Sequence, residues 1–189
     1  VNAEAAEKFC RSMDEGRLCG INDLILLACG RVMREFPELR CRMEGDEVVE
    51  FASANIGIAV AVKDGLVVPV IEGIDAMTIE TLSQAARAAV GNARSGKVSG
   101  TGRGTFTVTN LGMFGVEEFA AIINPPESAI LAVGAIRDAV VAAGGQVRAG
   151  RVMTLTLSLD HRLVDGVTAA RFMAKLKDLI ESPQSLSKP

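Results

Sequence analysis

The stretch LTLSLDHRLVDGVTAARFMAKLKDLI, residues 155–180, contains a strand pattern and a helix pattern joined by a short turn. Its beginning completes an apolar run, residues 151–159, that is typical of a β-strand. From Ala169 to Ile180 the apolar side chains recur at helical spacing. The segment 160–166 therefore predicts a tight connection from a sheet to an amphipathic helix that covers it.

This turn carries the only histidine of the chain, His161. Histidine is the side chain whose ordinary pKa lies nearest neutrality, so a histidine fixed between two elements can accept a proton from a nucleophile and return it. A structural interpretation competes with this one, because Asp165 and Gly166 can simply form a turn that caps the following helix. The turn by itself leaves both interpretations open.

Composition favours a single domain over residues 1–189. The chain is 49% apolar and 23% charged, which suits one well-buried core. Its net charge of −3 provides no basic stripe for nucleic acid, and no apolar run reaches the length of a transmembrane helix. We therefore expect neither a nucleic acid nor a membrane as a partner.

The cysteines lack the short paired spacing of zinc sites, and no signal-peptide pattern precedes them. We expect reduced, mostly buried thiols and a reducing compartment, in preference to a redox or metal role, for Cys10, Cys19, Cys29 and Cys41.

Periodicity predicts helices and hairpins that mix without strict alternation. Predicted helices cover residues 2–15, a second helix capped by Asn22 and running to about Glu35, a third from Thr78 to Ser95-Gly96, and the helix after residue 166. Predicted strands cover residues 56–62, 66–71, 105–110, 129–133, 136–142 and 151–159, with a turn at Asp64-Gly65 and an edge position for the strand that contains Pro69. This pattern indicates an α/β fold with a mixed β-sheet and helices mainly on one face. The glycine-rich segment 99–104 is predicted to be a loop, because it precedes a strand and does not match a dinucleotide-binding fingerprint.

Three segments occur in a characteristic order: GTFTVTNLGMFG at 104–115, INPPESAILAVG at 123–134 and DHRLVDG at 160–166. Together they closely resemble the catalytic domain of the dihydrolipoamide acyltransferases of 2-oxo acid dehydrogenase complexes, and the pyruvate dehydrogenase members most of all. Residues 22–33 and 56–72 also look like family segments, so the resemblance covers nearly the whole chain.

The resemblance implies a chloramphenicol acetyltransferase-like two-layer sandwich that forms trimers, with each active site between two subunits. His161 would be the general base and Thr109, where many relatives carry serine, would stabilise the oxyanion from the neighbouring chain; on a strand, threonine alone indicates only β-propensity. Asp165 belongs to the same signature, and we expect it to organise the loop or orient the ring without transferring a proton. The resemblance does not identify the residues that contact coenzyme A.

The implied substrates are coenzyme A and a lipoyl group carried on a separate domain, with no metal. Implied partners are the lipoyl domain, the decarboxylase and dihydrolipoamide dehydrogenase components, and further trimers in a cubic or dodecahedral core, in a bacterial cytoplasm or a mitochondrial matrix. Relatives carry an additional N-terminal helix and strand, lipoyl and subunit-binding domains, and often a leucine-rich C-terminal tail, none of which we recognise in residues 1–189.

Other functions remain open from the residues. Retention of His161, Asp165 and Thr109 argues against a non-catalytic core subunit. The segments 109–112 and 124–127 make another coenzyme A-dependent acetyltransferase of the same fold less favoured. A metal site formed by Asp160, His161 and Asp165 is the least favoured alternative, because one histidine and two nearby carboxylates give no convincing ligand geometry. Acetyl is the expected acyl group, with succinyl and branched groups as alternatives.

Overall fold

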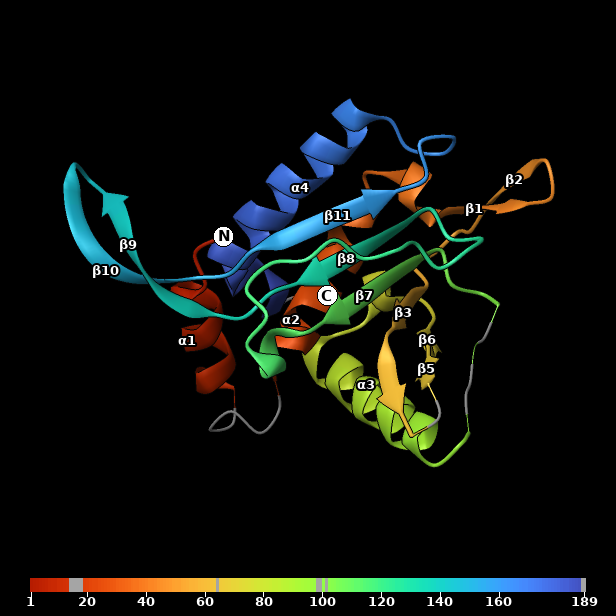
Figure 1. The fold of residues 1–189 in the computed structure, drawn as a ribbon, viewed down its shortest axis with the longest axis horizontal. Helices are drawn as coiled ribbons and strands as arrows, with labels where there is room; N and C mark the ends of the chain where they lie inside the picture. The colour runs from red at the N-terminus through yellow and green to blue at the C-terminus, as the bar shows by residue number, and fades with distance from the viewer. Residues whose placement is uncertain (14–18, 64, 98–99, 101, 188–189) are drawn as a thin grey trace.

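A five-stranded sheet lies at the centre of the computed structural model, which describes residues 1–13, 19–63, 65–97, 100 and 102–187 (Figure 1). The strand order is β11-β8-β7-β3-β6. Strand β7 runs parallel to β3 and β8, whereas the two outer pairs are antiparallel, so the predicted mixed sheet is confirmed. The strands comprise β3 (Ile56–Ile58), β6 (Val70–Ile71), β7 (Phe106–Asn110), β8 (Ala129–Val133) and β11 (Leu155–Leu159).

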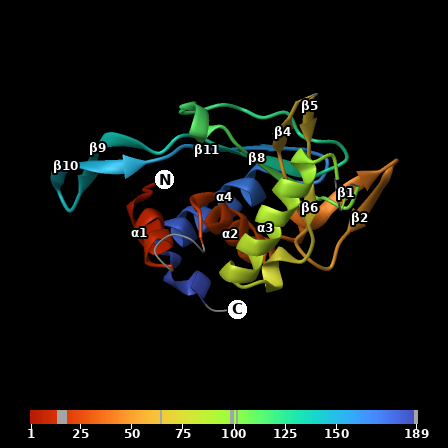
Figure 2. The ribbon, with the colours of Figure 1, turned by 90° about the horizontal axis from the view of Figure 1, so that it is seen from below.

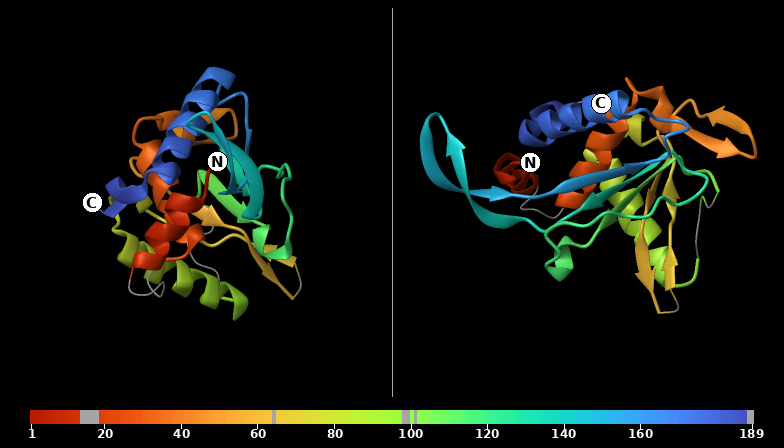
Figure 3. Two further views of the ribbon diagram at one scale, coloured as in Figure 1. Left: turned by 90° about the vertical axis from the view of Figure 1, so that its left-hand side faces the viewer. Right: turned by 45° about the horizontal axis from the view of Figure 1, so that its top comes forward.

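The α-helices pack on one side of this sheet, as Figures 2 and 3 show. They are α1 (Glu4–Ser12), α2 (Ile21–Met33), α3 (Ile79–Arg94) and α4 (Gly166–Glu181). Helix α2 lies in the middle of the layer, and its run from Leu24 to Gly30 is buried throughout. The predicted two-layer sandwich with helices mainly on one face is confirmed.

Phe172 joins the two layers. This α4 side chain is fully buried, and its ring lies 5.8 Å from the ring of Phe36 in an edge-on arrangement. On the other side it lies 5.9 Å from the ring of Phe106 on β7. Edge-on and tilted aromatic contacts add to the free energy of apolar burial, so this trio holds α4 against the centre of the sheet.

Helix α2 begins two residues earlier than predicted, and Asn22 is not its cap. Gly20 occupies the cap position, where its backbone N–H donates to the carboxylate of Asp23 at 2.9 Å. Asn22 lies within the first turn, and its side-chain oxygen accepts a hydrogen bond from Asn110 at 3.4 Å. Both residue types are allowed at a cap, and the tertiary contact with β7 decides between them.

The predicted hairpin around residues 56–71 is confirmed, but each of its arms is split. Strands β4 (Val60–Val62) and β5 (Gly65–Val67) pair with each other outside the central sheet, whereas β3 and β6 belong to it. The arm breaks at Ala59, whose N–H donates to Val108 of β7 at 3.0 Å. Strand β6 lies at the sheet edge, as the preceding Pro69 predicts.

The predicted strand over residues 151–159 is two strands. Strand β10 (Gln146–Val152) pairs with β9 (Arg137–Ala143) in a hairpin that projects beyond the sheet in Figure 1, and β11 then returns to β8. Ion pairs from Glu4 and Glu7 of α1 to Arg148 and Arg151 hold the base of this hairpin, at 2.7 and 3.0 Å.

The sequence patterns above do not predict the β1–β2 hairpin (Cys41–Glu44 and Glu47–Glu50), which turns at Gly45 with a φ of +63°. Short 3-10 helices complete the described elements, at Pro37–Arg40, Ile74–Ala76, Gly112–Phe114 and Pro183–Ser187. No helix in the described part of the chain has both the length and the apolarity required to cross a membrane.

We expect Phe172→Ala to lower the free energy of unfolding by about 3–5 kcal/mol, because it empties a site packed between two other rings. Urea unfolding measures this loss. The matched control is Val167→Ala on the same helix, where the side chain is 63% exposed and the expected change is within about 0.5 kcal/mol. Equal losses in the two variants would contradict this role of Phe172.

Candidate functional site

His161 lies exposed in a three-residue turn between β11 and α4. The backbone on both sides is fixed by hydrogen bonds. The N–H of Asp160 donates to the carbonyl of Ser128 at 2.8 Å, and the carbonyl of Asp160 accepts from Leu163 and Val164 at 2.9 and 3.0 Å. Val164 is fully buried, so the turn is held at its base while the imidazole remains accessible to solvent.

The charges beside His161 neutralise each other. The guanidinium of Arg162 contacts both carboxylate oxygens of Asp160, with its Nε 3.0 Å from Oδ1, and the N–H of Arg162 donates to the same carboxylate at 3.0 Å. These hydrogen bonds lower the pKa of Asp160 to about 2. The pair therefore stays ionised throughout the neutral range, and its residues serve as supports for the turn.

Asp165 is the N-cap of α4. Its carboxylate accepts from the backbone N–H groups of Val167 and Thr168 at 2.7 and 2.8 Å and from the Thr168 hydroxyl at 3.2 Å. The hydrogen bonds from the helix N-terminus, with a smaller contribution from His161, hold the pKa of Asp165 below its usual range. The structure therefore supports the loop-organising role of Asp165, because both carboxylate oxygens are engaged by the helix.

Thr109 lies half-buried near the end of β7. Thr105 and Thr107 share its side of the strand, whereas Phe106 and Val108 point into the core. The next residue, Asn110, accepts from the N–H of Gly112 at 2.8 Å and donates to Asn22. The strand end that carries Thr109 is thus fixed against the start of α2.

The structure does not bring Thr109 and His161 together within one chain. Strand register aligns Thr109 with Ala132 of β8, and Ala132 with Thr156 of β11. Strand β11 ends at Leu159, three positions or about 10 Å beyond Thr156, and His161 lies in the turn that follows this end. The two side chains therefore belong to opposite ends of the sheet, and any site that uses both needs a second copy of the chain.

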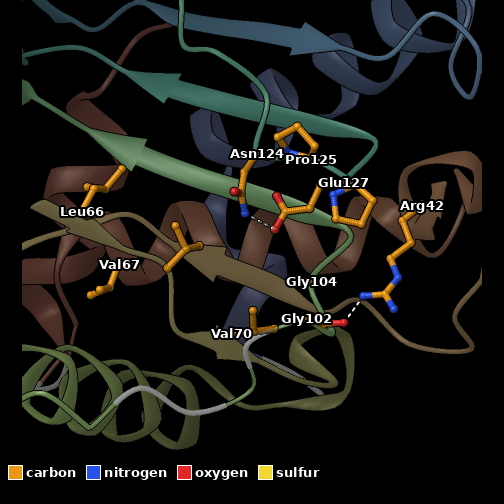
Figure 4. Close-up of a pocket in the computed structure, with 11 residues that line it drawn as sticks. Arg42, Leu66, Val67, Val70, Gly102, Gly104, Asn124, Pro125 and Glu127 are labelled. Atoms are coloured by element: carbon orange, nitrogen blue, oxygen red, sulfur yellow. Dashed lines mark hydrogen bonds between the residues drawn. The ribbon is translucent and has the colours of Figure 1, made fainter. Parts of the chain in front are cut away.

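A buried carboxylate that sequence reasoning missed lies at the His161 end of the sheet. Glu127 is only 4% exposed, and its side chain accepts from the hydroxyl of Thr107 at 2.5 Å and from the amide of Asn124 at 3.0 Å. Figure 4 shows it on the wall of a cavity of about 390 Å³, across from Arg42. The sequence signal that could have identified this carboxylate is a charged residue just before the apolar strand β8, in the family-like segment 123–134.

Burial raises the pKa of Glu127, against the hydrogen bonds from Thr107 and Asn124 and the charge of Arg42, which lower it. The neighbouring backbone leaves the carboxylate little space. A Cβ atom at Gly104 would lie 2.6 Å from Glu127 Oε1, so a larger residue at this position would force the Glu127 carboxylate to move. The cavity lining also includes Arg42, which donates to the carbonyl of Gly102.

Among the described residues, no three histidine, cysteine, aspartate or glutamate side chains gather in a way that could hold a metal ion.

The sequence matches the family described as 2-oxoacid dehydrogenases acyltransferase (catalytic domain) over residues 3–187. The dihydrolipoyllysine-residue acetyltransferase component of the pyruvate dehydrogenase complex of Rickettsia conorii is 36% identical over 174 residues, which are 91% of this chain and 42% of the relative. The mitochondrial component of Schizosaccharomyces pombe is 40% identical over 178 residues, 91% of this chain and 37% of the relative. The chain thus spans about two fifths of the length of these relatives.

Solved structures agree with this match. The cubic core of a pyruvate dehydrogenase multienzyme complex superposes with a TM-score of 0.88 at 29% identity, covering 98% of this chain and 80% of that one. Azotobacter vinelandii dihydrolipoamide acetyltransferase, studied for the roles of a serine, a histidine and an asparagine in its catalytic mechanism, gives 0.89 with the same identity and coverage. A chloramphenicol acetyltransferase, at 17% identity and a TM-score of 0.58 over 95% of this chain and 85% of that one, shares the fold. The predicted fold family is confirmed.

We expect Glu127→Gln to stabilise the protein relative to wild type increasingly as pH rises. With the folded-state pKa raised, the stability present below the ordinary carboxyl pKa is lost as pH rises through the folded-state value. Glutamine keeps the size of Glu127 and one acceptor oxygen, has a donor NH2 group in place of the other oxygen, and cannot ionise. Melting temperatures of both proteins between about pH 4 and about pH 8 test this.

The control for this series is Glu47→Gln, at an exposed position on β2. The difference between that variant and wild type should change little with pH. A Glu127→Gln difference that stays flat or shrinks with rising pH would show that the buried carboxylate carries no ionisation penalty.

We expect Asp165→Ala to lower the melting temperature by a few degrees, because two N–H groups of α4 lose their acceptor. Asp165→Asn keeps a side chain of the same length with an acceptor oxygen, so this variant should have the melting temperature of wild type. Thermal unfolding of both variants distinguishes the effect of the capping hydrogen bonds from that of the negative charge. A fall in melting temperature as large in the asparagine variant as in the alanine variant would contradict the capping role.

Proposed function

Because this chain belongs to the 2-oxoacid dehydrogenase acyltransferase family, we propose that it transfers an acyl group between coenzyme A and a dihydrolipoyl thiol. The observation that carries the proposal is the His161 turn, in which the only imidazole of the chain is exposed between a neutralised ion pair and a helix cap. A scaffold subunit would have no use for that arrangement.

His161 acts as general base in this proposal. It takes the proton from the thiol of coenzyme A as the sulfur attacks the carbonyl carbon of the acyl-dihydrolipoyl thioester. The resulting tetrahedral intermediate carries its negative charge on the former carbonyl oxygen. When the intermediate collapses, the bond to the lipoyl sulfur breaks, and His161 returns the proton to that thiolate.

Thr109 of a neighbouring chain donates its hydroxyl hydrogen bond to the oxyanion. Sequence spacing supports this role and that of His161. The serine, histidine and asparagine studied in the Azotobacter vinelandii enzyme are separated by fifty-two and then four positions, as are Thr109, His161 and Asp165. Threonine for serine keeps the hydroxyl, and aspartate for asparagine keeps a helix-capping oxygen.

In a trimer with sites between its subunits, Thr109 of one chain can lie beside His161 of another, although the two residues are far apart within one chain. The relatives named above include the cubic core of a multienzyme complex, and we propose that trimers of this chain assemble into a comparable core. The lipoyl domain, the decarboxylase and the dihydrolipoamide dehydrogenase are the partners that this function requires. Because the relatives are bacterial and mitochondrial, we propose that the reaction takes place in a bacterial cytoplasm or a mitochondrial matrix.

Acetyl is the proposed acyl group. The relatives reported above are named acetyltransferases, and the segment from Asn110 to Gly115 most resembles the pyruvate dehydrogenase members. Rates with acetyl-, succinyl- and isobutyryl-coenzyme A at equal concentration decide this. A higher kcat/KM for succinyl- or isobutyryl-coenzyme A would indicate that the chain serves a different 2-oxo acid dehydrogenase complex.

We expect His161→Ala in the full-length protein to lower kcat for acetyl transfer from acetyl-coenzyme A to dihydrolipoamide by about 10²–10⁴-fold. Thr109→Val should lower it by about 10²–10³-fold, since valine has the shape of threonine without the donor. Thr109→Ser is the matched control and should remain within a few-fold of wild type. Wild-type activity in the His161→Ala variant would contradict the role of His161 as the base, whereas a wild-type protein no more active than this variant would favour the scaffold alternative.

A further inference from the structure

Two cysteine side chains outside the proposed site lie in direct contact. Cys10 in the last turn of α1 and Cys19 just before α2 place their Sγ atoms 2.9 Å apart, although the residues are nine positions apart in sequence. Both side chains are almost fully buried, with exposed fractions of 5% and 3%. Both thiols are free.

This separation is less than 1 Å longer than a disulfide bond of about 2.05 Å. A small movement at the end of α1 and at the residue before α2 would bring the sulfurs to bonding distance. The other two cysteines have different surroundings. Cys29 is fully buried within α2, and the thiol of Cys41 donates to the carbonyl of Pro37 at 3.4 Å.

A small reagent can approach the pair. Both cysteines line a cavity of about 230 Å³, together with Glu7, Arg11 and Ile21. Deep in the helix layer, by contrast, Cys29 has an exposed fraction of 0%. The sulfur–sulfur contact therefore distinguishes this pair among the four cysteines, and the cavity gives a reagent access to it.

The contact also makes the two sulfurs unequal. A hydrogen bond from the Cys10 thiol lowers the pKa of Cys19, and the same contact together with burial raises the pKa of Cys10. Burial and the carboxylates of Asp23 and Glu80 act on Cys19 in the opposite direction. Cys19 is consequently the better attacking sulfur of the pair, because the thiolate is the nucleophile in disulfide exchange.

We propose that Cys10 and Cys19 form a reversible disulfide by exchange with a small-molecule disulfide such as oxidised glutathione. The Cys19 thiolate attacks one sulfur of the reagent, which breaks the reagent's S–S bond and releases one thiol. Cys10 then loses its proton and attacks the Cys19 sulfur of the mixed disulfide, which releases the second thiol. The protein loses two electrons and two protons, and the reagent is reduced to two thiols.

The experiment incubates the folded, full-length protein in glutathione buffers of increasing oxidised fraction, quenches with acid and alkylates the free thiols after denaturation. We expect two thiols to escape alkylation together, and reductant to restore them. Trypsin should then yield the peptide of residues 9–11 joined to that of residues 18–31, with fragment masses that place the link at Cys19.

Three variants control the assignment. Cys10→Ser and Cys19→Ser should each abolish the link, whereas Cys41→Ala should retain it. The wild-type peptide map decides the question even if a variant fails to fold. The proposal is overturned if all four thiols stay alkylated throughout the series, if glutathione remains attached to a single cysteine, or if the link involves Cys29.

Discussion

The register of β8 between β7 and β11 determines how far apart the two proposed reactive side chains lie. The backbone hydrogen bonds among these three strands fix this register, and a slip by one residue would turn Phe106 and Val108 of β7 away from the core. Thr109 and His161 consequently occupy opposite ends of one rigid sheet. Local flexibility cannot bring the two ends of such a sheet together, so catalysis by this pair requires association of chains.

The turn that presents His161 combines rigidity with accessibility. Its backbone polar groups are satisfied by Asp160 and Ser128, and the flanking charges of Asp160 and Arg162 pair with each other. Asp165 fixes the beginning of α4, which Phe172 anchors to the sheet. The backbone that carries the imidazole is thereby fixed, and the ring is exposed where it can meet a substrate, as a general base requires.

Elements with strong periodicity could be predicted from sequence. Strand β8 has the predicted bounds, and α3 and α4 begin next to the predicted caps, because in these segments the local pattern and the tertiary environment favour the same structure. Predictions failed where a distant contact decides the structure. Asn22 contacts Asn110 and does not cap α2, and the return of β11 to β8 divides the predicted strand over 151–159.

The candidate site shows the same division. The motif at 160–166 identified His161 and Asp165, and the structure shows how the turn supports them. Glu127 was missed because its burial depends on Thr107, Asn124 and the close approach of Gly104, which no local pattern reveals. The contact between Cys10 and Cys19 likewise depends on how α1 packs beside α2, and their sequence spacing alone favoured unpaired thiols.

The most direct test of the shared site is complementation between two inactive variants. His161→Ala and Thr109→Val chains are produced together, and mixed trimers are purified by different tags on the two chains. A site between subunits predicts acetyl transfer in the mixed trimers well above that of either variant alone, because some sites then combine an intact His161 with an intact Thr109. Mixed trimers as inactive as their parents would contradict a site built from two chains.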